Sequence, residues 1–256
     1  VHASQIMIGK TPEQVLDLLP LMFSVCGIAQ ARGSLNAIMQ QLNIPTTLAQ
    51  EKAREMLVIA ETAREHLFRI FMDWPQLFDS PRNNQLFPFI TSLTKRMSEA
   101  LFKSGNAFKL NSELQVNQSQ LNQLISEIEQ QLSTHVFQCP VEQWLSFRSI
   151  EEVTLWAKSN DCITATSLQS ILKNNWHDQG YQLSSALPEL DFEKLAERLR
   201  HTSAKQFIAQ PDWDGRLYET TPLTRQLNHP LIQNLQHGYG NTLITRWVAR
   251  LVELAI

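Results

Sequence analysis

The longest regular stretch of the sequence runs from Thr47 to Trp74 and reads TLAQEKAREMLVIAETAREHLFRIFMDW. Its apolar residues recur every three or four positions, namely Ala53, Leu57, Ala60, Leu67, Ile70 and Phe71. That spacing places them along one side of an α-helix, where they would face a hydrophobic core. Pro75 cannot be accommodated inside a regular helix and is expected to end this one. A helix of this length favours a mainly α fold.

The same periodicity, together with N-cap residues, predicts helices along most of the chain. The Gln- and Asn-rich segment 111–131 carries leucine and isoleucine at helical spacing, which favours an amphipathic helix over a flexible linker. One β-hairpin is expected near residues 205–220, because Asp214-Gly215 between apolar segments is a turn signal. The other expected helices start near Thr11 (ending at Pro20), Ser24 (ending near Leu42), Ile90 (ending near Lys103), Ser149 and Asp191.

Composition describes an ordinary globular chain of 256 residues, with 43% hydrophobic residues, 18% charged residues and a net charge of −3. It contains no run of Lys and Arg, so we expect no nucleic-acid partner. The longest apolar stretch, from Leu16 to Phe23, is far shorter than the roughly 20 residues of a membrane-spanning helix. We expect no membrane insertion. The sequence shows no secretory signal pattern, which makes the cytoplasm the expected location.

The three cysteines, Cys26, Cys139 and Cys162, are far apart in the sequence. An odd number of separated cysteines does not resemble a disulfide framework and suits a reducing compartment. No second cysteine follows Cys26 at CxxC spacing, because Ala29 occupies that position. Glycine-rich phosphate loops, His-Glu-x-x-His and nucleophile-elbow motifs are also absent. The sequence therefore offers no conventional catalytic site.

Three stretches nevertheless carry distinctive patterns. Residues 21–31 read LMFSVCGIAQA, residues 210–225 read QPDWDGRLYETTPLTR, and residues 245–251 read TRWVARL. In this order they resemble the R-x-C-G-x-C-x-x-x-H, P-R-Y-x-G-x-x-x-E-V-G-P-L-A-R and G-R-x-x-A-R motifs of nickel-iron hydrogenase large subunits. The resemblance implies that residues 1–256 form a single domain, a helical bundle similar to the core of such a subunit.

The departures from that pattern concern the metal ligands. In the large subunits, the first Cys of the amino-terminal motif is a terminal nickel ligand and the second bridges nickel and iron. Here the first is Cys26, whereas Ala29, Ser24 and Gly33 replace the second Cys, the Arg and the His. The 256 residues also contain no counterpart of the D-P-C-x-x-C motif that supplies two further thiolates. The resemblance therefore implies a non-catalytic chain without a complete nickel-iron site and without the carboxy-terminal metal-ligand segment.

Hydrogenase expression/formation scaffold proteins of the HupK/HoxV type show a similar loss. They share the single Cys and the segment represented here by Glu219, Arg225 and His229. This resemblance implies a maturation scaffold or chaperone in which Cys26 transiently binds an Fe(CN)2CO fragment. Arg225, with Glu219 nearby, could donate hydrogen bonds to the cyanides. The implied partners are the hydrogenase large-subunit precursor and accessory maturation proteins.

Each candidate residue also has a simpler interpretation. A cysteine beside glycine on an apolar helix is commonly a small buried side chain, which applies to Cys26. Arg225 could form an ion pair with Glu219 in a buried network. Asp212 and Asp214 could serve acid–base chemistry or bind a cation, but beside a glycine they are more typical of a turn. Structural roles are expected for the remaining candidates, Cys139, Cys162, His66 and His229.

The alternative function is a metal-free docking module that mimics the large subunit and binds its maturation partners. Replacing Cys26 by Ala separates the two hypotheses, because only the scaffold needs the thiol. An active hydrogenase would need a second Cys near residue 29 and a carboxy-terminal Cys pair, which this sequence does not contain.

Overall fold

The computed structural model describes residues 3–78, 80–81, 84–183 and 185–256, and most of these residues are helical. The mainly α prediction is confirmed, since extended segments among the described residues pair only through isolated bridges. Every described helix is too short or too polar to span a lipid bilayer. The chain divides into two compact units, Val1–Val136 and Phe137–Ile256, which are described separately. That residues 1–256 form a single domain stays a prediction.

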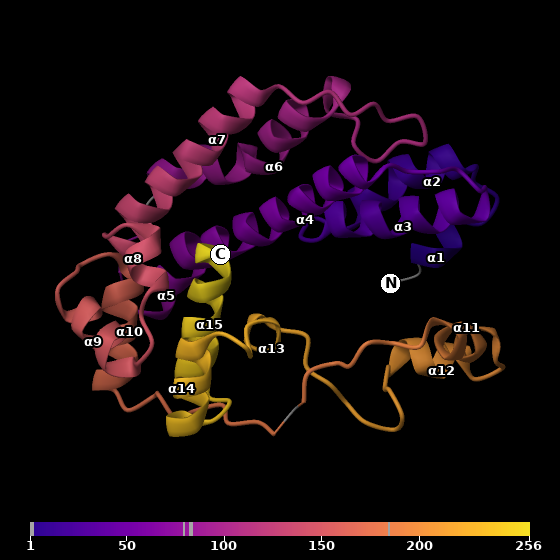
Figure 1. Cartoon of the computed structure of the whole chain (residues 1–256). Coiled ribbons are helices and arrows are strands. Elements are labelled where there is room, and N and C mark those ends of the chain that lie inside the picture. The colour runs from indigo at the N-terminus through magenta and orange to yellow at the C-terminus, as the bar shows by residue number, and fades with distance from the viewer. Residues whose placement is uncertain (1–2, 79, 82–83, 184) are drawn as a thin grey trace. The chain divides into compact units, whose positions relative to one another are not determined.

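The first unit consists of helices of very different lengths (Figure 1). Its longest helix, α4, packs against α3 and α6, and α6 in turn packs against α7. In chain order the elements are α1 (Ala3–Ile6), α2 (Pro12–Leu18), the 3₁₀ turn η1 (Leu19–Met22), α3 (Gly27–Gln41), α4 (Leu48–Phe68), the π-helical turn η2 (Arg69–Asp73), α5 (Trp74–Leu77), η3 (Asn84–Leu86), α6 (Phe87–Leu101), η4 (Lys103–Gly105) and α7 (Gln118–Gln131).

The start of α4 is fixed by a reciprocal capping box. The Thr47 hydroxyl accepts a hydrogen bond from the Gln50 backbone N–H at 3.2 Å, and the Gln50 side-chain oxygen accepts one from the Thr47 N–H at 3.0 Å. Two backbone donors that the helix cannot satisfy internally are thereby paired. A similar box at Thr11 and Gln14 starts α2, as the sequence predicts.

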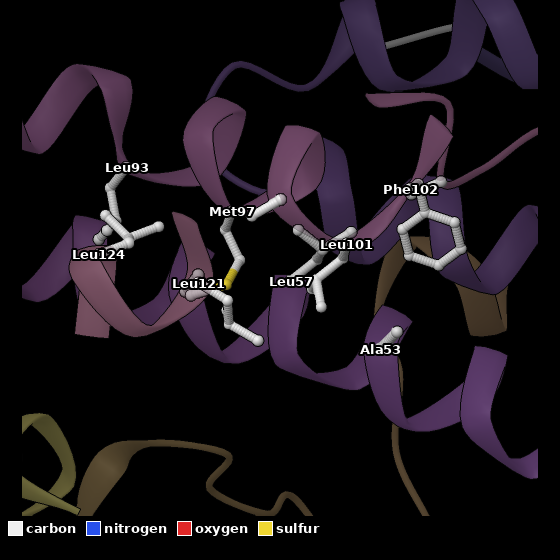
Figure 2. Close-up of a cluster of buried hydrophobic side chains, with 11 residues drawn as sticks. Ala53, Leu57, Leu93, Met97, Leu101, Phe102, Leu121 and Leu124 are labelled. Atoms are coloured by element: carbon white, nitrogen blue, oxygen red, sulfur yellow. The ribbon is translucent and has the colours of Figure 1, made fainter. Parts of the chain in front are cut away.

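The core of the first unit lies where α4, α6 and α7 meet (Figure 2). The apolar stripe predicted for residues 47–74 supplies one side of it, with Leu57 fully buried. Burying a leucine of this kind contributes about 1.5–3 kcal/mol relative to leaving it exposed. The labelled members of this core are Ala53, Leu57, Leu93, Met97, Leu101, Phe102, Leu121 and Leu124.

A buried arginine ties the connection between α6 and α7 to α4. Arg54, only 1% exposed, donates hydrogen bonds to the Ala107 carbonyl oxygen at 3.1 Å and to the Ser112 hydroxyl at 2.8 Å. Its guanidinium also pairs with Glu51 at 2.9 Å. A buried charge requires this degree of pairing. Arg54 therefore has a structural role, since its donors are used by the chain itself.

Two helix boundaries in this unit differ from the prediction. The expectation that Pro75 ends the long helix is wrong, because the π-helical turn η2 leads into α5, where Pro75 occupies the first turn. A first-turn proline lacks only an N–H that would have no intrahelical partner. The helix predicted over 111–131 begins later, at Gln118, because the Asn117 side chain caps it by accepting from the Gln120 N–H at 3.1 Å.

The second unit is built from shorter helices. The π-helical turn η5 (Leu132–Phe137) contains the boundary between the units. The helix pairs α9 with α10, α13 with α15, and α14 with α15 pack together. In chain order the helices are α8 (Val141–Leu145), α9 (Ile150–Lys158), α10 (Ile163–Lys173), α11 (Phe192–Arg200), α12 (Ala204–Ala209), α13 (Pro222–Arg225), α14 (Pro230–Tyr239) and α15 (Leu243–Ala255).

The β-hairpin predicted near residues 205–220 is wrong. Residues 204–209 form α12, and only a tight turn remains, in which Trp213 and Arg216 exchange backbone hydrogen bonds of 2.9 and 3.1 Å. The turn itself is as predicted, with Gly215 at a φ of 72°. Short apolar runs do not distinguish a strand from a helix, and the Ala, Lys and Gln of this run favour the helix.

Candidate functional site

Cys26 lies at the N-cap of α3, directly before Gly27 begins the helix. Its side chain is half-buried and, among the described residues, makes no capping hydrogen bond to the start of α3. Gly27 packs closely against η1, since a Cβ atom built on it would lie 2.8 Å from the Pro20 carbonyl oxygen. A larger residue at position 27 would push the Cys26 segment away from η1.

The start of α3 is capped instead by Glu61, a residue of α4. Glu61 Oε1 accepts a hydrogen bond from the Ile28 N–H at 2.8 Å, and Oε2 accepts one from the Ala29 N–H at 2.9 Å. The Glu61 side chain is buried, with 5% of the residue exposed. Its charge is stabilised there by the two donors and by the positive end of the helix dipole. Glu61 thus binds the backbone that follows Cys26.

Arg64, on the next turn of α4, binds the backbone that precedes Cys26. Its Nη2 atom donates to the Val25 carbonyl oxygen at 3.1 Å and to the Glu65 carboxylate at 2.8 Å. The same atom lies 4.0 Å from the Glu61 carboxylate. Glu61 and Arg64, which we call the α4 clamp, therefore hold the chain on both sides of Cys26.

A pocket of about 320 Å³ adjoins the residues before Cys26. Val25 and Phe68 contribute apolar surface to it, and Arg64, Glu65 and Thr91 contribute polar groups. The Arg64 guanidinium is already paired with a carboxylate, so the pocket presents no excess positive charge. A neutral or weakly charged group fits this lining better than a strongly anionic one.

Glu219, in the second unit, is held by α15. Its carboxylate accepts two hydrogen bonds from the Arg246 guanidinium, one of them 2.9 Å long, and another from the Thr221 hydroxyl. The Glu219 side chain is only 8% exposed. Burial lowers the pKa of Arg246. Glu219 is therefore part of a paired, buried network.

Arg225 pairs with a different residue of α15. Its guanidinium donates to the Glu253 carboxylate through Nε at 2.5 Å and Nη2 at 2.7 Å, which raises the pKa of Arg225. The simpler interpretation of an Arg225–Glu219 pair is therefore wrong, although both residues are paired. Arg225 and Glu219 belong to the second unit and Cys26 to the first. That these residues act together on one metal fragment stays a prediction.

Comparison with known proteins bears on the function. No family model matches the chain. The hydrogenase expression/formation protein HupV of Azotobacter chroococcum mcd 1 is 34% identical over 71 residues, which cover 28% of this chain and 21% of the relative. HupK of Rhodobacter capsulatus is 36% identical over 72 residues, covering 28% and 21%. HoxV of Cupriavidus necator is 34% identical over 73 residues, covering 28% and 18%.

Part of this chain is similar to hydrogenase expression/formation proteins. The matched part amounts to about a fifth of the length of the curated relatives. The relatives' names place them in the formation of a hydrogenase, as the sequence resemblance implies. What the whole relatives do reaches this chain only as a proposal.

The other predicted candidates are explained by local structure. Asp212 accepts from the Gly215 N–H at 3.0 Å and pairs with Arg198, as expected of a turn residue. Burial raises the pKa of both the Cys139 and Cys162 thiols, which disfavours their reactive thiolate forms. Among the described residues, no three Cys, His, Asp or Glu side chains come together as a metal-binding group.

The residues that hold the candidates in place lie far from them along the chain. Glu61 and Glu253 carry no motif that marks them in the sequence, whereas Arg246 lies in the stretch 245–251 that resembles the G-R-x-x-A-R motif, without a sign of its pairing with Glu219. Glu61 follows the buried Leu57 by four positions, so a charged residue on the apolar side of α4 was the available signal. His66, on the same helix, is buried, which suits the structural role predicted for it. His229 is the N-cap residue of α14 but makes no side-chain capping hydrogen bond within the described part of the chain, so its structural role stays a prediction.

Proposed function

We propose that this chain is a non-catalytic scaffold in the assembly of a nickel-iron hydrogenase active site. In this role Cys26 would bind an Fe(CN)2CO fragment before its transfer to the large-subunit precursor. The supporting observation is that the α4 clamp fixes the backbone around Cys26 while the thiol makes no capping hydrogen bond among the described residues. The partial similarity to hydrogenase expression/formation proteins supports the same role.

A single thiolate suits cargo that has to be released. Cysteine thiolate is a soft ligand, appropriate for iron in this type of chemistry. The two cyanides and one carbonyl already supply three of the iron's ligands, so the cargo needs fewer protein ligands than a bare ion. Breaking one iron–sulfur bond then suffices for transfer.

A role for Arg225 and Glu219 in stabilising the cargo remains a proposal that rests on the motif resemblance. Cyanide ligands are negatively charged and accept hydrogen bonds, which a guanidinium can supply. The Arg225 Nε and Nη2 atoms are engaged by Glu253. Its Nη1 atom makes only a long contact of 3.4 Å with the Thr220 carbonyl oxygen. Nη1 is therefore the atom that we propose would serve a cyanide.

The deciding experiment measures iron in the purified chain together with its infrared spectrum in the cyanide and carbonyl stretching region. The protein is produced together with hydrogenase maturation genes. Bound iron with cyanide and carbonyl bands is expected in the parent protein and should be absent from Cys26→Ala. Cys139→Ala is the matched control, because it also removes a half-buried thiol. Equal iron content and bands in Cys26→Ala would refute the scaffold function.

A second candidate function is the metal-free docking module. It is favoured by the large apolar side chains that residues 181–217 leave exposed, with Leu183, Leu217 and Phe192 at 87%, 80% and 76% exposure. Exposed apolar surface of this kind is typical of protein contact sites. If this function is correct, Cys26→Ala supports normal hydrogenase maturation, whereas a Leu183→Ser, Leu217→Ser double variant does not.

A further inference from the structure

The cap of α3 is unusual because it comes from another helix. An N-cap side chain normally accepts a hydrogen bond from the backbone N–H of the second or third helical residue. In α3 these residues are Ile28 and Ala29, and Cys26 is the N-cap residue. Both N–H groups are instead bound by Glu61, one to each carboxylate oxygen, at 2.8 and 2.9 Å.

In α3 the residue at the N-cap position, Cys26, is not the residue that binds the first free N–H groups, which is Glu61. Glu61 satisfies the donors at the start of α3 and offsets the positive end of its dipole. The side chain at position 26 is then not needed as a cap. The thiol of Cys26 makes no capping bond in the described structure, although the residue itself is held on both sides by the α4 clamp.

We propose that Glu61 is a positioning residue for Cys26, which keeps the thiol available to an external metal by occupying the N–H groups of Ile28 and Ala29. The inference rests on the proposed function in so far as the external metal is the scaffold's iron. It assigns Glu61 an effect beyond the stability of α3. Without Glu61, the Cys26 sulfur would turn toward the two vacated N–H groups. These donors would then compete with the metal for the lone pairs of the sulfur.

The test uses Cd²⁺ as the probe, because a cadmium–thiolate bond gives an ultraviolet charge-transfer absorption. The dissociation constant is measured by titrating the parent chain, Glu61→Ala, Glu61→Gln and Glu65→Gln. Loss of a residue that orients a metal ligand typically weakens affinity by about 10-fold or more. We expect about this effect in Glu61→Ala and a smaller one in Glu61→Gln, which keeps one acceptor oxygen.

Glu65→Gln is the matched control. Glu65 is the neighbouring carboxylate on α4 and pairs with the Arg64 guanidinium, whereas the α3 N–H groups are bound by Glu61. Its cadmium affinity should stay close to that of the parent. Circular dichroism and urea unfolding of each variant show whether it is folded at the titration temperature. A purely structural Glu61 would change the unfolding midpoint and leave the absorption and affinity of the folded protein unchanged.

The inference is overturned if folded Glu61→Ala binds Cd²⁺ as tightly as the parent, or if Glu65→Gln is weakened equally. It is also overturned if the absorption persists in Cys26→Ala, because the Cys26 thiol would then not be the accessible ligand. Failure of the proposed function looks different. In that case the co-produced protein lacks iron and cyanide bands, while the cadmium titrations still depend on Glu61.

Discussion

Helices α6 and α11 carry the same kind of sequence pattern but differ in what covers them. The apolar stripe of α6, which includes Ile90, Leu93 and Met97, is buried against neighbouring helices. No residue of α11 is buried, although Phe192, Leu195 and Leu199 also lie on one side of the helix. Periodicity therefore predicts that a helix has an apolar side, whereas burial depends on a partner that the local pattern does not contain.

The largest expected effect comes from truncating one leucine in each region. Leu57→Ala, in the core beside α6, should lower the free energy of unfolding by about 2–5 kcal/mol, because it leaves a cavity. Leu199→Ala, in the half-exposed stripe of α11, should change it by less than about 0.5 kcal/mol. Urea denaturation followed by circular dichroism measures both. Similar losses in the two variants would show that α11 is covered in solution.

Removing a helix cap gives a smaller contrast. Thr47→Ala should destabilise the first unit by about 1 kcal/mol, because the cap of α4 is lost.

Asp191 caps α11 through the Glu193 and Lys194 N–H groups at 3.0 and 3.1 Å. Asp191→Ala should speed hydrogen exchange in residues 192–200 without moving the global urea midpoint, since α11 opens locally. A shift of the global midpoint in Asp191→Ala would contradict this.

The smallest expected effect is a pH dependence confined to the α11 region. The Arg198 hydrogen bond and the Gly215 N–H lower the pKa of Asp212 in the folded chain. The stabilisation is therefore present above the unfolded pKa of an aspartate and is lost as the pH falls through the lower folded value. Because Arg198 and Asp212 are both partly exposed to solvent, the effect is modest and weakens with salt.

Hydrogen exchange of residues 192–215 as a function of pH measures this effect. After correction for the intrinsic pH dependence of amide exchange, protection should fall in acid in the parent chain, whereas Arg198→Gln should remove most of this fall. The α4–α6 core serves as the internal reference, because its protection should not depend on the ionisation of Asp212. Equal acid sensitivity in the parent and in Arg198→Gln would exclude the Arg198–Asp212 pair as the cause.

The sequence was informative where one local signal dominates. The stripe of α4, the capping boxes at Thr11 and Ser149 and the Asp191 cap all depend on residues close in sequence, and all are present in the structure. The hairpin near 205–220 failed because a run of six residues carries too little periodicity to separate strand from helix. The Pro75 prediction failed because the adjoining π-helical turn is not visible in a pattern of apolar residues.

The candidate site was predictable only in part for a similar reason. Cys26, Glu219 and Arg225 could be selected from motif resemblance, whereas their partners lie far away along the chain. Glu61 contacts residues more than thirty positions earlier, and Glu253 pairs with Arg225 across a comparable separation. Such contacts depend on tertiary packing, which neither spacing nor propensity encodes. The ligand role of Cys26 itself stays a prediction.

Capping α3 from α4 also has a consequence for protein engineering. Because Glu61 supplies the cap, position 26 is released from the usual restriction to Ser, Thr, Asp or Asn at the start of a helix. A histidine or another metal-binding side chain could be introduced there without removing the hydrogen bonds to Ile28 and Ala29. The metal-binding side chain at position 26 can thus be exchanged while the hydrogen bonds that fix the start of α3 are kept.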